Sequence, residues 1–251
     1  MSRSKNRRRK KGKARNIAFD AMIVVVVAII GISGFMIYQI EHNYKHDKDS
    51  YKKINSEVRD EEEGFTGDID WTKLREINSD VVGWLYLEDS NIDYPIVQSR
   101  DNDEYLHTLF DGNAGAAGSI FVDAGTLNPF GQFNTVVYGH HMKDGSMFAD
   151  LRKFKDMDYA KSHGRFELIT PGTKYHLDIY AFLNCPADSE VYRCNVEDED
   201  RDDYLNTINN SAEYTTNMAI GEDDKLVVLS TCAYEYDDAR YVIVGKLTPW
   251  S

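Results

Sequence analysis

Three residues far apart in this sequence have side chains suited to covalent catalysis at a carbonyl group: Cys232, His140 and Arg240. A thiolate is a nucleophile. An imidazole can accept the thiol proton and later protonate a leaving amine, and a guanidinium can hydrogen-bond an oxyanion. Free cysteine and histidine have pKa values of about 8.5 and 6.5, so without an ion pair little thiolate–imidazolium forms at neutral pH. A cysteine, a histidine and an arginine together predict a slow, selective cysteine enzyme, although each of these residues alone could be structural.

The elements around Cys232 and Arg240 predict that the two residues meet. Cys232 follows an apolar, β-branched run, 225–231, and Arg240 precedes a second one, 241–247. Two such runs joined by a short polar loop are typical of a hairpin. We therefore expect the thiol and the guanidinium to face each other across its two stems.

The histidine lies just after a third strand-like run. Residues 134–138 are followed by Gly139 and His140, a glycine-containing turn of the kind where catalytic groups often lie. For His141 we expect a solvated loop histidine. No HExxH or CxxC spacing accompanies the pair, so we expect no metal.

Short strand-like runs with interspersed helical stretches, and no βαβ rhythm, continue from residue 81 to the C-terminus. This pattern predicts a mostly β fold with α additions, a closed or nearly closed mixed barrel of about eight strands. Before the terminal hairpin, strands are expected at 82–88, 92–98 (with Pro95 at an edge or a bulge), 117–123, 135–138, 165–170 and 174–183. Helices are expected at 70–78 with Asp70 as N-cap, at 101–110, from 147 onward and at 198–209.

The N-terminus has the pattern of a membrane signal anchor. The first 16 residues carry nine Lys or Arg and no acid, and residues 21–40 carry no charge, enough for a helix of about 30 Å. A cleaved signal peptide is the alternative, but the run is long and no small-x-small site follows. We expect a cytoplasmic basic tail at 1–16, a transmembrane anchor at 17–40, a charged stalk at 41–69 and an extracellular catalytic domain at 70–251.

Two further compositional features limit the function. Without its first 16 residues the chain has 20 basic and 42 acidic residues, a formal charge of −22, which argues against a nucleic-acid partner. Three cysteines in an exported domain leave at least one free thiol. Cys185 and Cys194 could form a disulfide or both remain unpaired.

Three separated motifs give this chain a recognisable pattern. The segment from Val228 to Cys232 (VLSTC), the segment from Tyr138 to Met142 (YGHHM) and the arginine on the next strand resemble the signature of class B sortases, over roughly residue 70 to the C-terminus. The resemblance implies an eight-stranded sortase-type β-barrel with N-terminal helices, preceded by one transmembrane helix. His140, Cys232 and Arg240 match the catalytic positions.

The family's activity is that of a cysteine transpeptidase without a cofactor. The resemblance implies cleavage of a C-terminal sorting signal on secreted proteins, a thioester intermediate and transfer to a peptidoglycan amine. A pilin-polymerising sortase, a simple cysteine endopeptidase and a non-enzymatic envelope scaffold remain alternatives.

The resemblance also implies five substrate-binding positions. Asn102 and Leu106 correspond to a helix that lines the signal-peptide groove, although a helix cap and a core leucine would explain them too. Tyr138 and Ser230 occupy positions that contact the signal, and Thr231 steadies the surroundings of the nucleophile.

Two segments are expected to set this chain's own specificity. The insertion at 186–209 resembles the class B substrate-binding insertion, with Tyr192 as a candidate contact. Ala233 stands where some relatives have a glutamate, and the acidic residues of the loop 233–239 are expected to be solvated.

Overall fold

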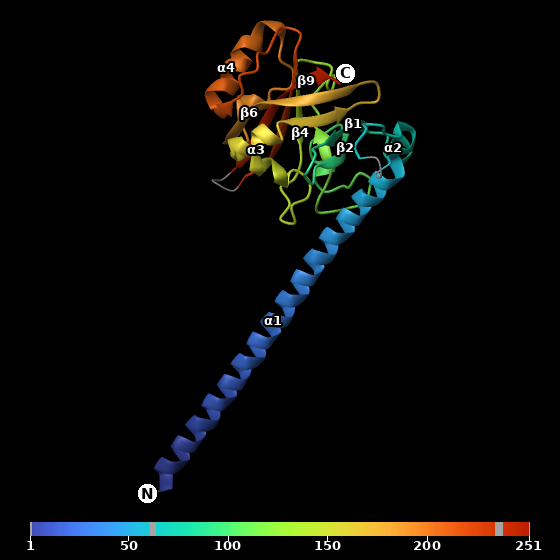
Figure 1. Ribbon diagram of the computed structural model, residues 1–251. Coiled ribbons are helices and arrows are strands. Elements are labelled where there is room, and N and C mark those ends of the chain that lie inside the picture. The colour runs from blue at the N-terminus through green and yellow to red at the C-terminus, as the bar shows by residue number, and fades with distance from the viewer. Residues whose placement is uncertain (1, 61–63, 234–237, 251) are drawn as a thin grey trace. The chain divides into compact units, whose positions relative to one another are not determined.

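The computed structural model describes residues 2–60, 64–233 and 238–250, with side chains from residue 22 onward. The chain forms two compact units, Met1–Lys45 and His46–Ser251 (Figure 1). Helix α1 (Ser2–Val58) begins in the first unit and ends in the second. From Met22 onward this helix is long and apolar enough to cross a membrane, which makes it a candidate span by length and composition.

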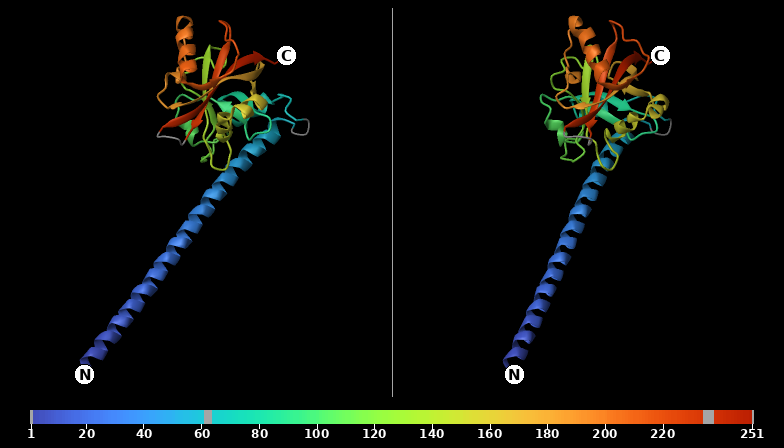
Figure 2. Two further views of the ribbon diagram at one scale, coloured as in Figure 1. Left: turned by 60° about the vertical axis from the view of Figure 1, so that its left-hand side comes forward. Right: turned by 90° about the vertical axis from the view of Figure 1, so that its left-hand side faces the viewer.

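The second unit is built on the predicted eight-stranded β-barrel, which is confirmed (Figure 2). Its strands pair in the order β5-β1-β2-β3-β4-β8-β9-β6, and the β5–β6 pair closes the ring. Strand β6 is long, so β5 pairs with its first part and the added strand β7 with its second. The strands are β1 (Val81–Tyr86), β2 (Asp93–Val97), β3 (Ile120–Val122), β4 (Asn134–Tyr138), β5 (Arg165–Ile169), β6 (Lys174–Pro186), β7 (Ala212–Thr215), β8 (Lys225–Cys232) and β9 (Ala239–Pro249).

Two strand pairings decide where the chemistry lies. Strands β8 and β9 form the expected antiparallel hairpin, with Cys232 directly opposite Arg240. Strands β4 and β8 run parallel, and Tyr138 is level with Ser230. Because parallel strands end at the same edge, the turn that carries His140 leaves the barrel beside the end of β8.

The helices match the sequence pattern in most places. Helix α2 (Trp71–Ile77) is capped as predicted, because the Asp70 carboxylate accepts hydrogen bonds from the amides of Thr72 and Lys73. Helix α3 (Met157–Ser162) and helix α4 (Arg201–Ser211) also lie in predicted stretches. Short 3-10 helices are η1 (Glu104–Leu106), η2 (Ala149–Lys155), η3 (Glu190–Tyr192) and η4 (Asp198–Asp200).

The helix predicted at 101–110 is wrong, since only η1 forms there. The Asp101 carboxylate accepts from the amides of Asp103 and Glu104, which makes a tight turn. The carbonyl of Tyr105 then bonds the amide of Ser119 instead of a residue one helical turn ahead. Bonds to a distant segment therefore replace the helical ones.

Pro95 does not lie on an edge strand, because β2 pairs with β1 on one side and β3 on the other. The β1–β2 pair does contain a bulge, between Val81 and Gly83 of β1, next to Pro95 and not at it. The pairing with β3 involves only Ile96 and Val97, so Pro95 lies outside it. The missing amide hydrogen of Pro95 therefore removes no hydrogen bond to β3, and the proline fits in a strand that has neighbours on both sides.

The end of α1 packs on the barrel. Tyr51, Ile54 and Val58 recur at helical spacing and are 5%, 3% and 2% exposed. The predicted tail, anchor, stalk and catalytic domain stay a prediction. Within the stretch assigned to the stalk, the structure adds that residues 46–58 belong to the compact catalytic unit.

Candidate active site

One cavity of about 320 Å³ contains every residue that the sequence predicts for the site. They come from the segment after β2, from the end of β4 and the turn that follows it, and from the ends of β8 and β9 that face each other: Asn102, Leu106, Tyr138, His140, Ser230, Thr231, Cys232 and Arg240. Phe121, Ala187 and Tyr192 complete much of its wall. The cavity therefore brings a thiol, an imidazole and a guanidinium to one surface.

Arg240 lies between two thiols on the barrel wall. It pairs with Cys232 of β8 on one side and with Cys185 of β6 on the other. Directly opposed residues of antiparallel strands point to the same face, so all three side chains share one face. The Arg240 guanidinium also donates to the carbonyl of Ala239 (3.0 Å).

All three thiols are free; Cys185 is buried, and Cys194 and Cys232 are half-buried. Desolvation raises the pKa of Cys185, and it raises the pKa of Cys194 to about 12. Cys232 is half-buried and lines the cavity. Neither Cys185 nor Cys194 belongs to the described lining, so Cys232 is the one of the three thiols that a substrate in the cavity would meet.

Gly139 fixes the turn that carries His140. A Cβ at this position would lie 2.5 Å from Ile120 Cδ1 and 2.7 Å from Phe148 Cδ2. The Gly139 amide donates to the Ser230 carbonyl (3.1 Å), and the Phe148 amide donates to the His140 carbonyl (2.9 Å). Close packing and two backbone bonds therefore hold the histidine against the end of β8.

The ring of His140 is oriented by a backbone carbonyl. Its Nε2 lies 2.7 Å from the carbonyl oxygen of Leu106. A carbonyl only accepts, so Nε2 carries the proton and Nδ1 is the unprotonated nitrogen of the neutral ring. In the neutral ring, Nδ1 is therefore the nitrogen that can accept a proton, while the Leu106 carbonyl accepts from Nε2.

His141 is not the solvated loop residue that we expected. It is half-buried, and its Nδ1 lies 2.8 Å from the carbonyl oxygen of Cys232, to which it donates. The parallel β4–β8 pairing causes this, because it places the residues after β4 beside the end of β8. His141 therefore binds the backbone of the predicted nucleophile.

Asp123, which the sequence did not single out, joins two predicted residues. Its carboxylate accepts from the Asn102 amide and from the Tyr138 hydroxyl, both at 3.0 Å. The side-chain oxygen of Asn102 accepts from the amide of Ala124 (2.8 Å), so Asn102 caps no helix. Burial, and then the Asp123 charge, raise the pKa of Tyr138 and keep it a neutral donor.

Tyr192 ties the insertion before α4 to the end of β8. Its hydroxyl lies 3.0 Å from Ser230 Oγ and 4.0 Å from Cys185 Sγ. Burial raises its pKa. Next to Ser230, Thr231 is 2% exposed, and its hydroxyl has no hydrogen-bond partner among the described residues.

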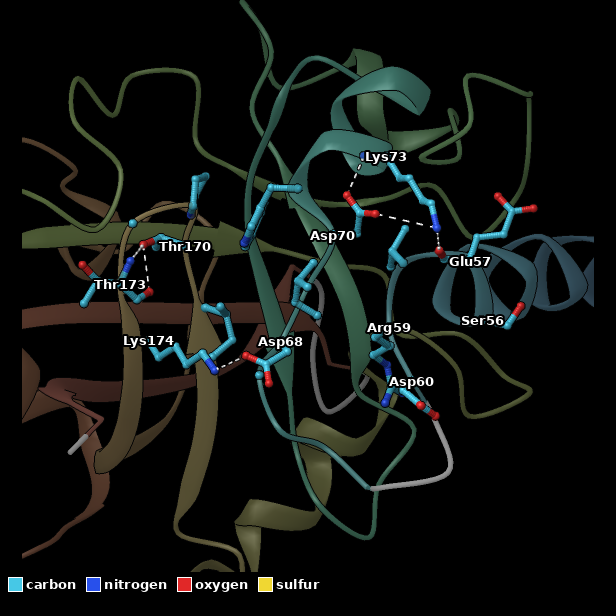
Figure 3. A pocket seen from close by; sticks show the side chains of 17 residues that line it. Ser56, Glu57, Arg59, Asp60, Asp68, Asp70, Lys73, Thr170, Thr173 and Lys174 are labelled. Carbon is cyan, nitrogen blue, oxygen red and sulfur yellow. Dashed lines mark hydrogen bonds and ion pairs between the residues drawn. The ribbon is translucent and has the colours of Figure 1, made fainter.

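A larger hollow of about 1070 Å³ lies elsewhere, between the ends of α1 and α2 and the β5–β6 turn (Figure 3). Its lysines are engaged: Lys174 pairs with Asp68 (2.6 Å), and Lys73 donates to the carbonyl of Glu57 (3.0 Å). Its described lining includes no cysteine or histidine. Among the side chains that the structure describes, no group of three or more His, Cys, Asp or Glu is placed to hold a metal ion.

Comparisons with known proteins agree on one family. A family model for the sortase domain matches residues 85–248. The chain is 38% identical over 251 residues to sortase B of Listeria monocytogenes, covering 94% of this chain and 98% of that protein.

Solved structures share its fold. A Staphylococcus aureus sortase B–substrate complex superposes with a TM-score of 0.73 at 24% identity, over 84% of this chain and 100% of that one. A sortase B complexed with triglycine superposes with a TM-score of 0.66 at 28% identity, over 72% of this chain and 86% of that one.

Proposed function

This chain belongs to the sortase family as a class B cysteine transpeptidase, and we propose that it joins secreted proteins to the cell wall from a membrane anchor. In this proposal it cleaves a C-terminal sorting signal through a thioester and transfers the new carboxyl end to a peptidoglycan amine. The observation that carries the proposal is the single cavity lined by Cys232, His140 and Arg240.

The proposed first half-reaction forms the thioester. His140 Nδ1 takes the thiol proton of Cys232, and the sulfur attacks the scissile carbonyl carbon. The Arg240 guanidinium hydrogen-bonds the oxyanion of the tetrahedral intermediate. The C–N bond then breaks, His140 returns its proton to the leaving amine, and the protein substrate stays attached to sulfur.

The second half-reaction restores the thiol. An acceptor amine attacks the thioester carbonyl, His140 takes a proton from the attacking nitrogen, and the C–S bond breaks as the thiolate leaves. The thiolate recovers that proton, and the product is a new amide. Glycine-type acceptors are favoured here, because a related sortase B has been solved with triglycine.

The proposed location is the outer side of a cytoplasmic membrane. The candidate span begins at Met22, and the nine cationic residues before it favour a cytoplasmic N-terminus. The catalytic unit would then act on proteins that have already crossed the membrane.

The test uses the full chain in detergent and a library of quenched fluorescent peptides built on NPxTx and xPxTG patterns, with and without triglycine. We expect one pattern to be cleaved, a Cys232-linked acyl-enzyme by mass spectrometry, and a peptide–triglycine product. Hydrolysis that no amine diverts would refute transpeptidation and indicate a plain endopeptidase. Cleavage of no peptide would contradict the proposed specificity.

A further inference from the structure

The carbonyl that orients His140 lies against Gly118, at a distance that leaves no room for a side chain. Gly118 has φ +56°, and a Cβ on it would lie 2.6 Å from the carbonyl oxygen of Leu106 and 2.5 Å from that of Tyr105. The neighbouring Ser119 amide donates to the Tyr105 carbonyl (2.9 Å). Only a glycine permits this close approach. The Gly115 amide donates to the His107 carbonyl (3.0 Å), so the segment 115–119 holds the backbone on both sides of the Leu106 carbonyl.

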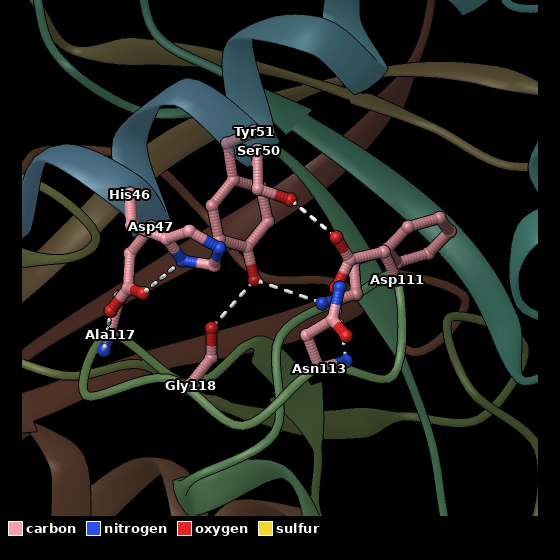
Figure 4. A network of polar contacts seen from close by, with 9 residues as sticks. His46, Asp47, Ser50, Tyr51, Asp111, Asn113, Ala117 and Gly118 are labelled. Carbon is pink, nitrogen blue, oxygen red and sulfur yellow. Dashed lines mark hydrogen bonds and ion pairs between the residues drawn. The ribbon is translucent and has the colours of Figure 1, made fainter. Parts of the chain in front are cut away.

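Gly118 is in turn held by the end of α1 (Figure 4). The Tyr51 hydroxyl donates to the Gly118 carbonyl (2.6 Å) and accepts from the Phe110 amide (3.3 Å). One turn earlier, the Asp47 carboxylate accepts from the Ala117 amide (3.0 Å). Tyr51 and Asp47 are 5% and 4% exposed, so these bonds are shielded from water.

We propose that Tyr51 and Asp47 are positioning residues for catalysis: they fix the segment 115–119, and this segment fixes the Leu106 carbonyl that holds Nε2 of His140. The inference rests on the proposed function, since it assigns His140 the acid–base role. Neither positioning residue belongs to the described lining of the active-site cavity. Their loss should therefore act on the chemical step and leave substrate binding nearly unchanged.

The first test compares two tyrosines in the full chain in detergent, with the fastest-cleaved peptide of the library above. Tyr51→Phe keeps the ring, which packs edge-on against Tyr94 at 5.1 Å, and removes only the hydroxyl. Tyr214→Phe is the matched control, because its hydroxyl also donates to a backbone carbonyl, that of Phe154 (2.6 Å), away from the site. We expect Tyr51→Phe to lower kcat about tenfold and to change KM by less than about twofold. A displacement of a catalytic group by 1 Å costs roughly a hundredfold in rate, so a smaller shift of His140 would account for this loss. Tyr214→Phe should change neither constant.

A second pair of variants tests the glycine contact directly. Gly118→Ala pushes a methyl group against the Leu106 carbonyl, whereas Gly112→Ala adds one in open space at a similar positive φ of 82°. Both variants place alanine at a positive φ, whereas only Gly118→Ala adds a close contact, so Gly112→Ala controls for the backbone conformation. We expect a fall in kcat of about a hundredfold for Gly118→Ala and wild-type kcat for Gly112→Ala.

His140→Ala, measured beside them, separates this inference from the proposed function. An inactive His140→Ala together with unchanged kcat in Tyr51→Phe would overturn the inference alone. Equal losses in Tyr51→Phe and Tyr214→Phe would overturn it too, because they would report general destabilisation. Full activity in His140→Ala would refute the proposed function and this inference with it.

Discussion

The substitution Gly139→Ala tests whether close packing holds the catalytic turn. Its Cβ would lie 2.5 Å from Ile120 Cδ1 and 2.7 Å from Phe148 Cδ2, distances that real Cβ atoms do not show. Ile120 and Phe148 are both 0% exposed, so neither can move aside without displacing the core. Overpacking of this kind costs about 1–3 kcal/mol.

The expected change is large enough to measure by thermal unfolding. A loss of about 2 kcal/mol corresponds to a fall in Tm of roughly 4–8 °C for a domain of this size. The strain is relieved most easily by moving the turn, so His140 should shift and the rate of peptide cleavage should fall by about ten- to a hundredfold.

A second glycine provides the control. Gly172 lies in the β5–β6 turn, and a Cβ there has nothing within 4 Å. Gly172→Ala should therefore keep the wild-type Tm and activity. If Gly139→Ala has the same Tm and the same rate of peptide cleavage as Gly172→Ala, close packing does not hold the turn that carries His140.

Three further predictions concern the cavity. Cys232→Ala should keep the wild-type Tm and lose all peptide cleavage, and any retained cleavage would contradict the thioester mechanism. Arg240→Ala should lower kcat about 10²–10³-fold, as loss of an oxyanion donor does; a change in KM alone would indicate a binding role instead. Iodoacetamide at pH 8 should modify Cys232 in the folded full chain and spare Cys185 and Cys194, because burial raises the pKa of both thiols and leaves them protonated below it. Peptide mapping by mass spectrometry would show this, and equal labelling of all three thiols would contradict it.

The strands and the hairpin could be predicted because their signals are local. Alternating or continuous apolar runs mark strands wherever they pair. The run 225–231 is buried throughout except at its first residue, as a strand between two neighbours should be. A hairpin loop of known length then fixes the pairing of Cys232 with Arg240. Strand β7 was missed, because its four residues alternate between partly buried and exposed and carry little apolar signal.

The contacts around the site could not be predicted in the same way, because they join distant segments. Asp123 meets Asn102 and Tyr138 only through the pairing of β3 with β2 and β4. His141 reaches the Cys232 carbonyl across 91 positions in the chain. The role of the Leu106 carbonyl cannot be predicted from residue types, because every residue has a backbone carbonyl. The expected solvated loop at Glu235 and Asp237 lies outside the described residues.

The group that accepts the hydrogen bond from the His140 ring affects the rate at which a site of this kind can work. A carboxylate beside an imidazole carries a full charge and stabilises the imidazolium strongly, whereas the Leu106 carbonyl carries only a dipole. A dipole stabilises the cation only when it is well aligned, so the acid–base step depends on the geometry of the backbone. In the proposed arrangement, the segment 115–119 and the end of α1 supply that geometry from outside the cavity. The rate of such a site is therefore sensitive to changes at residues that lie far from the cavity.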